Sequence, residues 1–96
     1  MLNSKQRAYL RGLANTMETI FQVGKGGVND ALIAQVDDAL RVRELIKVRV
    51  LETSPDSVKE VAQAVAAGTK ADVVQVIGSR FVLFRRNPKE PKIELI

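Results

Sequence analysis

The stretch Ile20–Leu51, IFQVGKGGVNDALIAQVDDALRVRELIKVRVL, decides the fold because its hydrophobic pattern changes twice along its length. Its apolar start, residues 20–23, predicts a strand, and a glycine-rich loop follows. Apolar residues then recur at helical spacing up to about Arg43, behind Asn29, which can cap a helix. Residues 45–51 alternate, which predicts a second strand. Strands separated by a helix favour parallel neighbours joined by a right-handed crossover.

The chain after this stretch predicts a further helix with two alternative starts. Serine is a good N-cap and proline suits the first helical position, so the helix is expected to open at Ser54-Pro55. Ser57 with Glu60 forms an alternative capping box one turn later. Gly68 is expected to end the helix in the left-handed conformation.

Both ends of the chain add elements to this unit. Residues 4 to about 14 repeat apolar side chains at helical spacing and predict an N-terminal helix. Residues 73–77 and 81–84 predict a hairpin, because the Gly78-Ser79 pair between them suits a type II′ turn. Residues 87–96 carry charges and two prolines, and they are expected to form a loosely held tail.

These elements predict one α/β domain over residues 1–96, with the order α-β-α-β-α-β-β. We expect two layers and a four-stranded mixed sheet, because the final hairpin adds one antiparallel strand. A chain of 96 residues is long enough to bury a single modest core.

The composition excludes several kinds of chemical site. The sequence contains no cysteine and no histidine, so it lacks disulfides, thiolate metal ligands and the commonest general base. The acidic pair Asp37-Asp38 suggests a metal site at first sight, but adjacent residues on a helix diverge by about 100°. The pair is therefore expected to be solvated. We expect no catalytic residue, no metal and no cofactor.

The charge predicts an anionic partner. The formal net charge is +4, which suits nucleic acid, a membrane surface or an acidic protein. A membrane is disfavoured, because no predicted helix joins a bulky apolar face to a lysine-rich one. The polar N-terminus does not resemble a secretory signal, and no window approaches the roughly 18 apolar residues of a span, so the expected location is the cytoplasm.

The loop Gly24-Lys25-Gly26-Gly27 is the main candidate for binding. Its glycines lack the Cβ atoms that would keep another backbone at a distance, and Lys25 adds a positive charge. The next helix presents unpaired N–H groups at its start, so the loop could seat a phosphate, as the G-x-x-G clamp of KH-type RNA binders does. A purely steric tight turn is the alternative. The mononucleotide and dinucleotide motifs are not present, so we expect no small-molecule substrate.

Basic residues elsewhere could extend this site. Lys47 and Arg49 alternate with apolar residues and would share one face of the sheet. If the register is as supposed, the same face holds further polar residues, namely Gln22, Gln75 and Arg85. Spaced cations on an exposed face can follow a phosphate backbone, whereas ordinary surface charge is the alternative interpretation.

Aromatic residues argue against base stacking as the mode of binding. The sequence has only four of them, Tyr9, Phe21, Phe81 and Phe84, and each fits a core or half-core position. An RRM would need aromatics displayed on its sheet. Contacts to backbone and shape should therefore dominate over contacts to bases.

Five stretches in a fixed order carry a family resemblance: KQR and LA within residues 5–14, FQVGKGGV at 21–28, ELIKV at 44–48, VQVIG at 74–78 and VL at 82–83. In their order and spacing they resemble the stand-alone bacterial YhbY-like proteins. Those proteins are single CRM domains, named for chloroplast RNA splicing and ribosome maturation. The resemblance runs from Ser4 to about Leu95.

The resemblance implies a fold similar to the C-terminal domain of translation initiation factor three, in which a fourth, antiparallel strand lies between the second and third of three parallel strands. It also implies binding to ribosomal RNA in precursors of the large ribosomal subunit. The family's proposed RNA contact maps onto Gly24, Lys25, Gly26 and Gly27. Basic residues around that loop are also implicated, and we place among them Lys5, Arg7 and Arg11.

The leading hypothesis is a monomeric, non-catalytic RNA-binding protein that assists assembly of the large ribosomal subunit. The alternative is a protein-interaction adaptor whose basic surface meets an acidic partner. An enzyme acting on nucleotides or RNA is the least favoured class, since the residue types for catalysis are missing.

Overall fold

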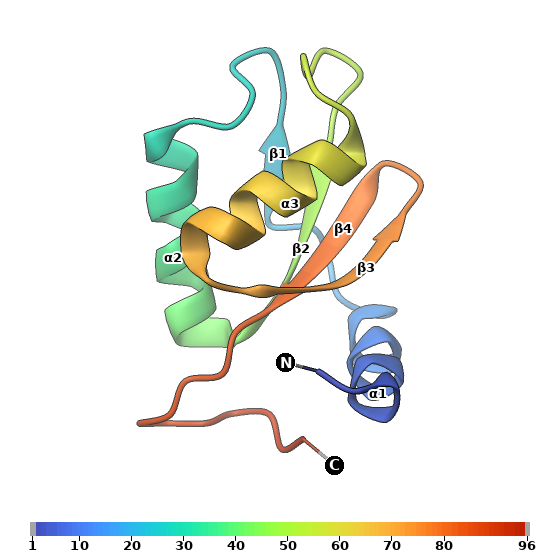
Figure 1. Cartoon of the computed structure of the whole chain (residues 1–96), viewed down its shortest axis with the longest axis vertical. Coiled ribbons are helices and arrows are strands. Elements are labelled where there is room, and N and C mark those ends of the chain that lie inside the picture. The colour runs from blue at the N-terminus through green and yellow to red at the C-terminus, as the bar shows by residue number, and fades with distance from the viewer. Residues whose placement is uncertain (1, 96) are drawn as a thin grey trace.

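The computed structural model describes residues 2–95 and shows the elements in the expected order (Figure 1). The helices are α1 (Ser4–Ala14), α2 (Asp30–Arg43) and α3 (Val58–Thr69). The strands are β1 (Phe21–Val23), β2 (Leu45–Val50), β3 (Asp72–Ile77) and β4 (Arg80–Phe84). The molecule is elongated, with principal extents of 37 × 25 × 22 Å.

The four strands form one mixed sheet in the order β1-β2-β4-β3. β1 pairs in parallel with β2, whereas β4 runs antiparallel to both β2 and β3. The fold class is therefore confirmed, and so is the strand order that the family resemblance implied. Gly78 has a φ of 57° in the turn between β3 and β4, which suits the predicted type II′ hairpin.

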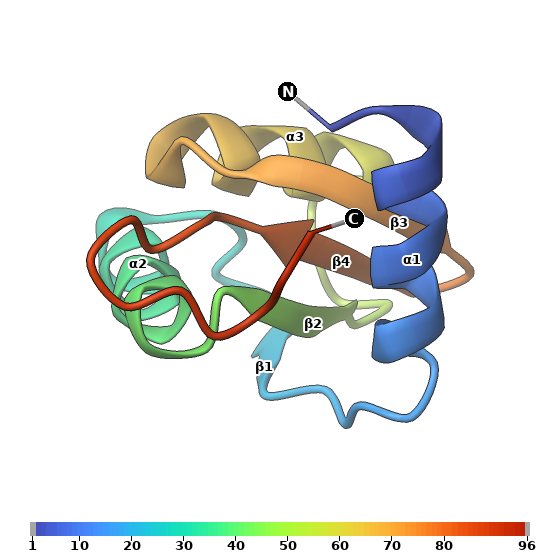
Figure 2. The ribbon, with the colours of Figure 1, turned by 90° about the horizontal axis from the view of Figure 1, so that it is seen from below.

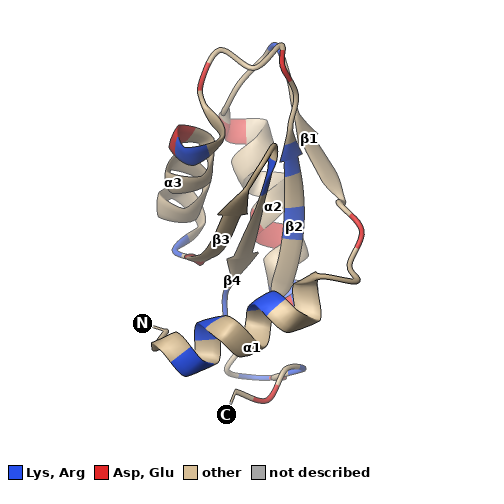
Figure 3. Ribbon diagram, turned by 90° about the vertical axis from the view of Figure 1, so that its right-hand side faces the viewer, with Lys and Arg blue, Asp and Glu red and all other residues tan. Residues whose placement is uncertain are grey.

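Helices lie on both faces of the sheet (Figure 2). Phe81 and Leu83 of β4 pack beneath α2 and α3, whereas the alternate residues Val82 and Phe84 pack against α1 on the other face. The sheet and the helices α2 and α3 form the two expected layers. Helix α1 adds a third layer at one end of the opposite face. No other helix of residues 2–95 covers that second face, which stays open beyond α1 (Figure 3). Arg49 is exposed on it, since its neighbours Val48 and Val50 point into the core on the opposite face.

The start of α3 follows the second of the two predicted signals. Ser57 is the N-cap: its Oγ accepts a hydrogen bond from the Glu60 N–H at 3.2 Å, and the Glu60 side chain accepts one from the Ser57 N–H. The prediction that this helix begins at Ser54-Pro55 was wrong. The Ser54 hydroxyl instead accepts from the Asp56 N–H at 3.3 Å and closes a local turn before the helix.

The prediction that Gly68 ends α3 was also wrong. The helix continues to Thr69, and Lys70 takes the left-handed conformation with a φ of 58°. A Cβ atom on Gly68 would lie 2.8 Å from Cδ1 of Ile33 on α2. Glycine at this position therefore allows α2 and α3 to approach closely.

The C-terminal segment is held in place, contrary to the expectation of a loose tail. Glu44, fully buried after α2, accepts hydrogen bonds from the backbone N–H groups of Asn87, Lys92 and Ile93 at 2.5–2.8 Å. Burial of this carboxylate raises its pKa, but the N–H donors outweigh burial and hold the pKa of Glu44 below its usual value. A buried anion thus anchors a segment whose composition alone suggested mobility.

Candidate nucleic-acid interface

The Gly24–Gly27 loop contains glycines of two kinds. A Cβ on Gly24 would lie 3.3 Å from Thr53 Oγ1, and one on Gly27 would lie 3.0 Å from Pro55 Cγ. Gly27 also has a positive φ of 61° and closes the turn by donating its N–H to the Gly24 carbonyl at 2.9 Å. The tight-turn explanation therefore accounts for Gly24 and Gly27.

Gly26 does not fit that explanation. A Cβ there would meet only the Asn29 Nδ2 atom, at 3.7 Å, which is an ordinary contact. The residue is exposed, and its φ lies outside the left-handed range. Neither space nor backbone conformation therefore requires glycine at position 26, and a Cβ atom could be placed there without strain.

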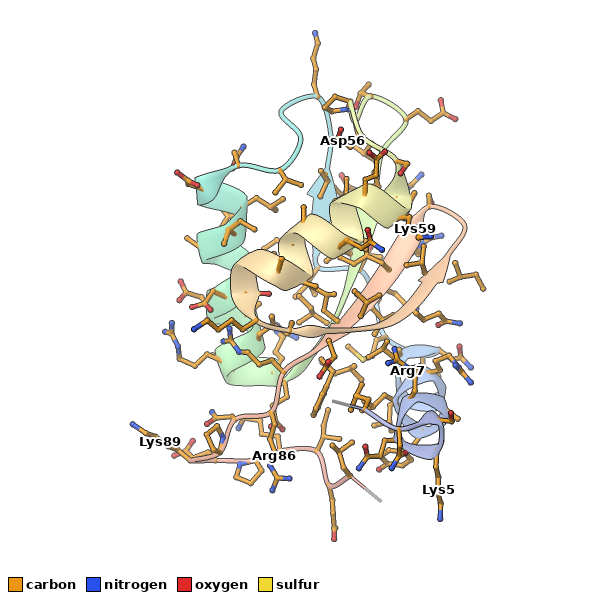
Figure 4. All side chains as sticks on the ribbon, viewed as in Figure 1. Lys5, Arg7, Asp56, Lys59, Arg86 and Lys89 are labelled. Atoms are coloured by element: carbon orange, nitrogen blue, oxygen red, sulfur yellow. The ribbon has the colours of Figure 1, made fainter. Side chains whose placement is uncertain are left out.

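The loop and the segment that follows β2 together form one tip of the molecule (Figure 1). The two segments lie side by side, since a Cβ atom on Gly24 or Gly27 would meet Thr53 or Pro55, and the Leu51 N–H donates to the Val23 carbonyl at 2.8 Å where they begin. Lys25 is exposed in the turn. Two exposed carboxylates, Glu52 and Asp56, belong to the second segment, and Figure 4 places Asp56 at this end of the molecule. The charge at the tip is therefore mixed.

Helix α2 supports the loop from one side. Asn29 caps it by accepting the Leu32 N–H at 2.8 Å, as predicted. Asp30 lies in the first turn, however, and its carboxylate offsets the positive end of the helix dipole. A hollow beside the loop is lined by Gln22, Val23, Gly24, Gly26, Gly27, Asn29, Ala31, Leu32 and Gln35.

The predicted basic face of the sheet exists and lies opposite α2 and α3 (Figure 3). Arg49 is exposed and lies beside Gln22 of β1 in the strand register. Lys47 is half-buried, and its Nζ donates to the Met17 carbonyl at 3.2 Å. Gln75 shares this face, since it pairs with Val82, whose other strand partner is Lys47.

Arg85 does not join this face. Its guanidinium binds the Asp37 carboxylate at 2.5 Å and the Thr69 carbonyl at 2.8 Å, on the side of α2 and α3. Alternation explains the error, since Phe84 packs against α1 and the next residue turns the opposite way. The hydrogen bond from Arg85 holds the pKa of Asp37 below its usual value, despite some opposing desolvation.

The cations of α1 lie away from the loop, so their predicted place around it was wrong. Helix α1 is at the end of the molecule opposite the tip, where it packs on the second face of the sheet (Figure 1). The Arg7 guanidinium donates to the Val73 carbonyl of β3 and so has a structural partner. Lys5 and Arg11 are exposed. The burial of Leu10 and Ala14 decides where α1 lies.

Arg80 is a candidate that the sequence prediction missed. It is exposed at the start of β4 and lies directly opposite Arg49 in the antiparallel register. The sequence did contain a signal for Arg80, because residues two apart on a strand point to the same face and Arg80 stands two residues before Val82. Lys47, Arg49 and Arg80 therefore share this face of the sheet, since Arg49 pairs with Arg80 and Lys47 pairs with Val82.

Residues 2–95 contain neither a membrane-spanning helix nor a cluster of metal ligands. No helix of this part of the chain is long and apolar enough to cross a membrane. No group of three or more aspartates and glutamates within it is placed to hold a metal ion.

Comparison with known proteins gives one consistent result. The family model of the CRS1/YhbY (CRM) domain matches residues 2–85. The Probable RNA-binding protein YqeI of Bacillus subtilis is 45% identical over 95 residues, covering 99% of each chain. An RNA-binding protein of Haemophilus influenzae is 35% identical over 94 residues, covering 98% of this chain and 94% of its own.

A solved structure agrees with these sequence relatives. The solution structure of the Staphylococcus aureus protein SAV1595, described as a candidate RNA binding protein, covers 100% of both chains. It superposes with a TM-score of 0.83 at 48% identity. The chain therefore belongs to the CRS1/YhbY (CRM) domain family.

Proposed function

We propose that this protein is a non-catalytic RNA-binding protein whose Gly24–Gly27 loop contacts the RNA backbone. The observation that carries the proposal is Gly26, a glycine that the fold does not need, exposed beside Lys25 at the tip. Relatives described as RNA-binding proteins along nearly the whole chain support the same class of ligand.

The chemistry of the loop suits a sugar-phosphate backbone. The missing Cβ at Gly26 lets a ligand backbone approach, and the Lys25 ammonium pairs with a phosphate oxygen. Lys47 and Arg49 widen the contact on the open sheet face, whereas Lys5 and Arg11 lie at its far end. Arg7, already bonded to Val73, contributes mainly by holding α1.

The protein recognises the shape and the sugar-phosphate backbone of the RNA more than its bases. Phe21 and Phe81 pack beneath α2 and α3, whereas Tyr9 of α1 and Phe84 of β4 belong to the cluster between α1 and the other face of the sheet. The open face therefore presents amides, cations and the exposed Ile77, which pairs with Arg80, and no aromatic platform among the described residues. Structured RNA is the ligand that such a surface recognises.

The family resemblance points to a particular RNA. YhbY-like proteins associate with precursors of the large ribosomal subunit, so we propose ribosomal RNA of these precursors as the ligand and assistance in their assembly as the role. In this proposal the protein acts in the cytoplasm as a monomer. It needs no cofactor, small-molecule substrate or membrane.

Titration of labelled ribosomal RNA fragments across a salt series tests this proposal. Lys25→Glu should weaken binding about tenfold or more and make the salt dependence shallower, because it removes one phosphate contact and adds a repulsive charge. Lys89→Glu is the matched control, since it makes the same charge change on an exposed residue at the far end (Figure 4).

Two results would contradict the proposal. One is equal affinity of wild type and Lys25→Glu at every salt concentration. The other is equal affinity of the wild type for ribosomal RNA and for duplex DNA of the same length.

A specific observation keeps the adaptor alternative open. An apolar hollow near α1 is lined by Leu13, Met17, Val42, Arg43, Leu45, Lys92 and Ile93, and Val42 is 61% exposed. Cations beside an apolar floor suit an acidic, apolar protein segment. Retention of a protein partner after nuclease treatment, with loss of that partner in Val42→Asp, would favour this function.

A further inference from the structure

The open sheet face contains a pair of like charges that the fold itself does not explain. Arg49 of β2 and Arg80 of β4 lie directly opposite each other in an antiparallel pair, and both are exposed. Like charges in this position destabilise a sheet. The ion pairs of residues 2–95 involve Arg41 and Arg85 only, so neither member of the pair is neutralised by a carboxylate.

The backbone beneath this pair is firmly held. The Val50 N–H donates to the Ser79 carbonyl at 2.7 Å, which ties the hairpin turn to the end of β2. Phe81, next to Arg80, is completely buried on the opposite face. The two guanidinium groups therefore extend from fixed strand positions, and little backbone freedom is lost when they share a ligand.

The surroundings favour an anion over other ligands. Gln22 of β1 pairs with Arg49 of β2, and its exposed side chain offers an amide donor. Lys47, two residues before Arg49 on the same strand, is about 7 Å away along it. A shallow hollow joins Lys47 and Arg80 with Met17, Glu18 and Thr19. Glu18 is the one acidic residue of that hollow, and it makes no ion pair with either cation.

We propose that Arg49 and Arg80 together bind one phosphate of the RNA, as a second contact apart from the Gly24–Gly27 loop. The inference rests on the proposed function, because it takes RNA as the ligand. Planar guanidinium forks suit phosphate oxygens, and a shared phosphate removes the repulsion between the two side chains. The RNA then runs from the tip along the sheet toward Lys47.

The test is a double-mutant cycle in the same ribosomal RNA titration. Arg49→Gln and Arg80→Gln should each weaken binding about five- to tenfold and reduce the salt slope by about one. The double variant should lose less than the product of the two single losses, because both side chains hold one phosphate. Arg86→Gln, the same change on an exposed arginine outside this face, should bind like the wild type.

Thermal unfolding separates a binding role from a structural one. Removing either charge relieves repulsion, so each single variant should melt at the wild-type temperature or slightly above it. A lower melting temperature in both variants, with binding lost in proportion, would overturn the proposal.

Lys25→Glu in the same series separates failure of this inference from failure of the proposed function. If Lys25→Glu binds weakly while both arginine variants bind like the wild type, the loop contact stands and the arginine pair is refuted. If only the arginine variants bind weakly, the pair is supported and the loop contact fails. If polyglutamate binds the wild type as tightly as RNA and depends equally on Arg80, the site is a general polyanion site and the inference is overturned.

Discussion

The two ends of this molecule use charge in opposite ways. At the end with α1 and the C-terminal segment, charged groups serve the fold: the Glu44 carboxylate holds three backbone N–H groups, and Arg7 holds a strand carbonyl. At the tip and on the adjoining sheet face, Lys25, Arg49 and Arg80 are exposed and take part in none of the ion pairs found in residues 2–95.

This difference shows that net charge is a poor guide to a binding surface. A formal charge of +4 is spread over the whole chain, yet some of its cations are already bonded within the fold. Arg85 is one example, held by Asp37 and Thr69. Lys25, Arg49 and Arg80 differ from these bonded cations, because they are exposed and take part in no ion pair found in residues 2–95.

The largest expected effect comes from a substitution of Glu44, which anchors the C-terminal segment. Glu44→Ala leaves three backbone N–H groups without their buried acceptor, and it should lower the free energy of unfolding by about 2–4 kcal/mol. Urea unfolding measures the loss. Glu90→Ala is the control on an exposed residue of the same segment and should change stability by less than about 0.5 kcal/mol.

The pH dependence of this effect has a definite sign. The pKa of Glu44 in the folded protein lies below the ordinary value of 4.5, so its stabilising contribution is fully present above that value. The contribution is lost as the pH falls through the folded-state pKa. The stability gap between wild type and Glu44→Ala should be constant down to about pH 5.5 and narrow in stronger acid. A gap that widened on acidification would contradict the anchoring role.

A smaller effect separates the two kinds of glycine at the tip. Gly27→Ala places a Cβ at a positive φ and 3.0 Å from Pro55 Cγ, and it should cost about 1–2 kcal/mol of stability. Gly26→Ala should leave stability nearly unchanged and weaken RNA binding instead. Chemical denaturation and RNA titration of both variants measure the two quantities. If Gly26→Ala bound RNA like the wild type, glycine at position 26 would lose its functional explanation.

The smallest expected effect concerns the far end of the basic face. Lys5 lies on α1, at the end of the molecule opposite Lys25, so Lys5→Gln should weaken RNA binding only about twofold. Lys25→Gln in the same buffer should have a clearly larger effect. An equal loss in both variants would mean that the RNA covers both ends of the molecule equally.

Local signals in the sequence predicted most of the fold. The cap at Asn29, the alternation in β2 and the Gly78-Ser79 turn each act within a few residues, and each was interpreted correctly. The predictions that α3 begins at Ser54-Pro55 and ends at Gly68 were wrong because serine and glycine each serve more than one purpose. Ser54 closes a local turn, and Gly68 allows two helices to touch.

The candidate site was less predictable because it depends on contacts between distant residues. The pairing of Arg49 with Arg80 follows from insertion of β4 beside β2, which no local pattern encodes. The distance of α1 from the loop follows from where its apolar side packs. Glu44 gave no signal, since its carboxylate binds residues more than forty positions later.

Amide chemical shifts of the labelled protein during titration with a ribosomal RNA fragment show where the RNA binds. The largest shifts are expected at Gly24–Gly27 and around Arg49 and Arg80, with little change in α3 beyond its first turn or in residues 87–95. Shifts confined to α1 and the C-terminal segment, with the tip unchanged, would contradict the proposed interface.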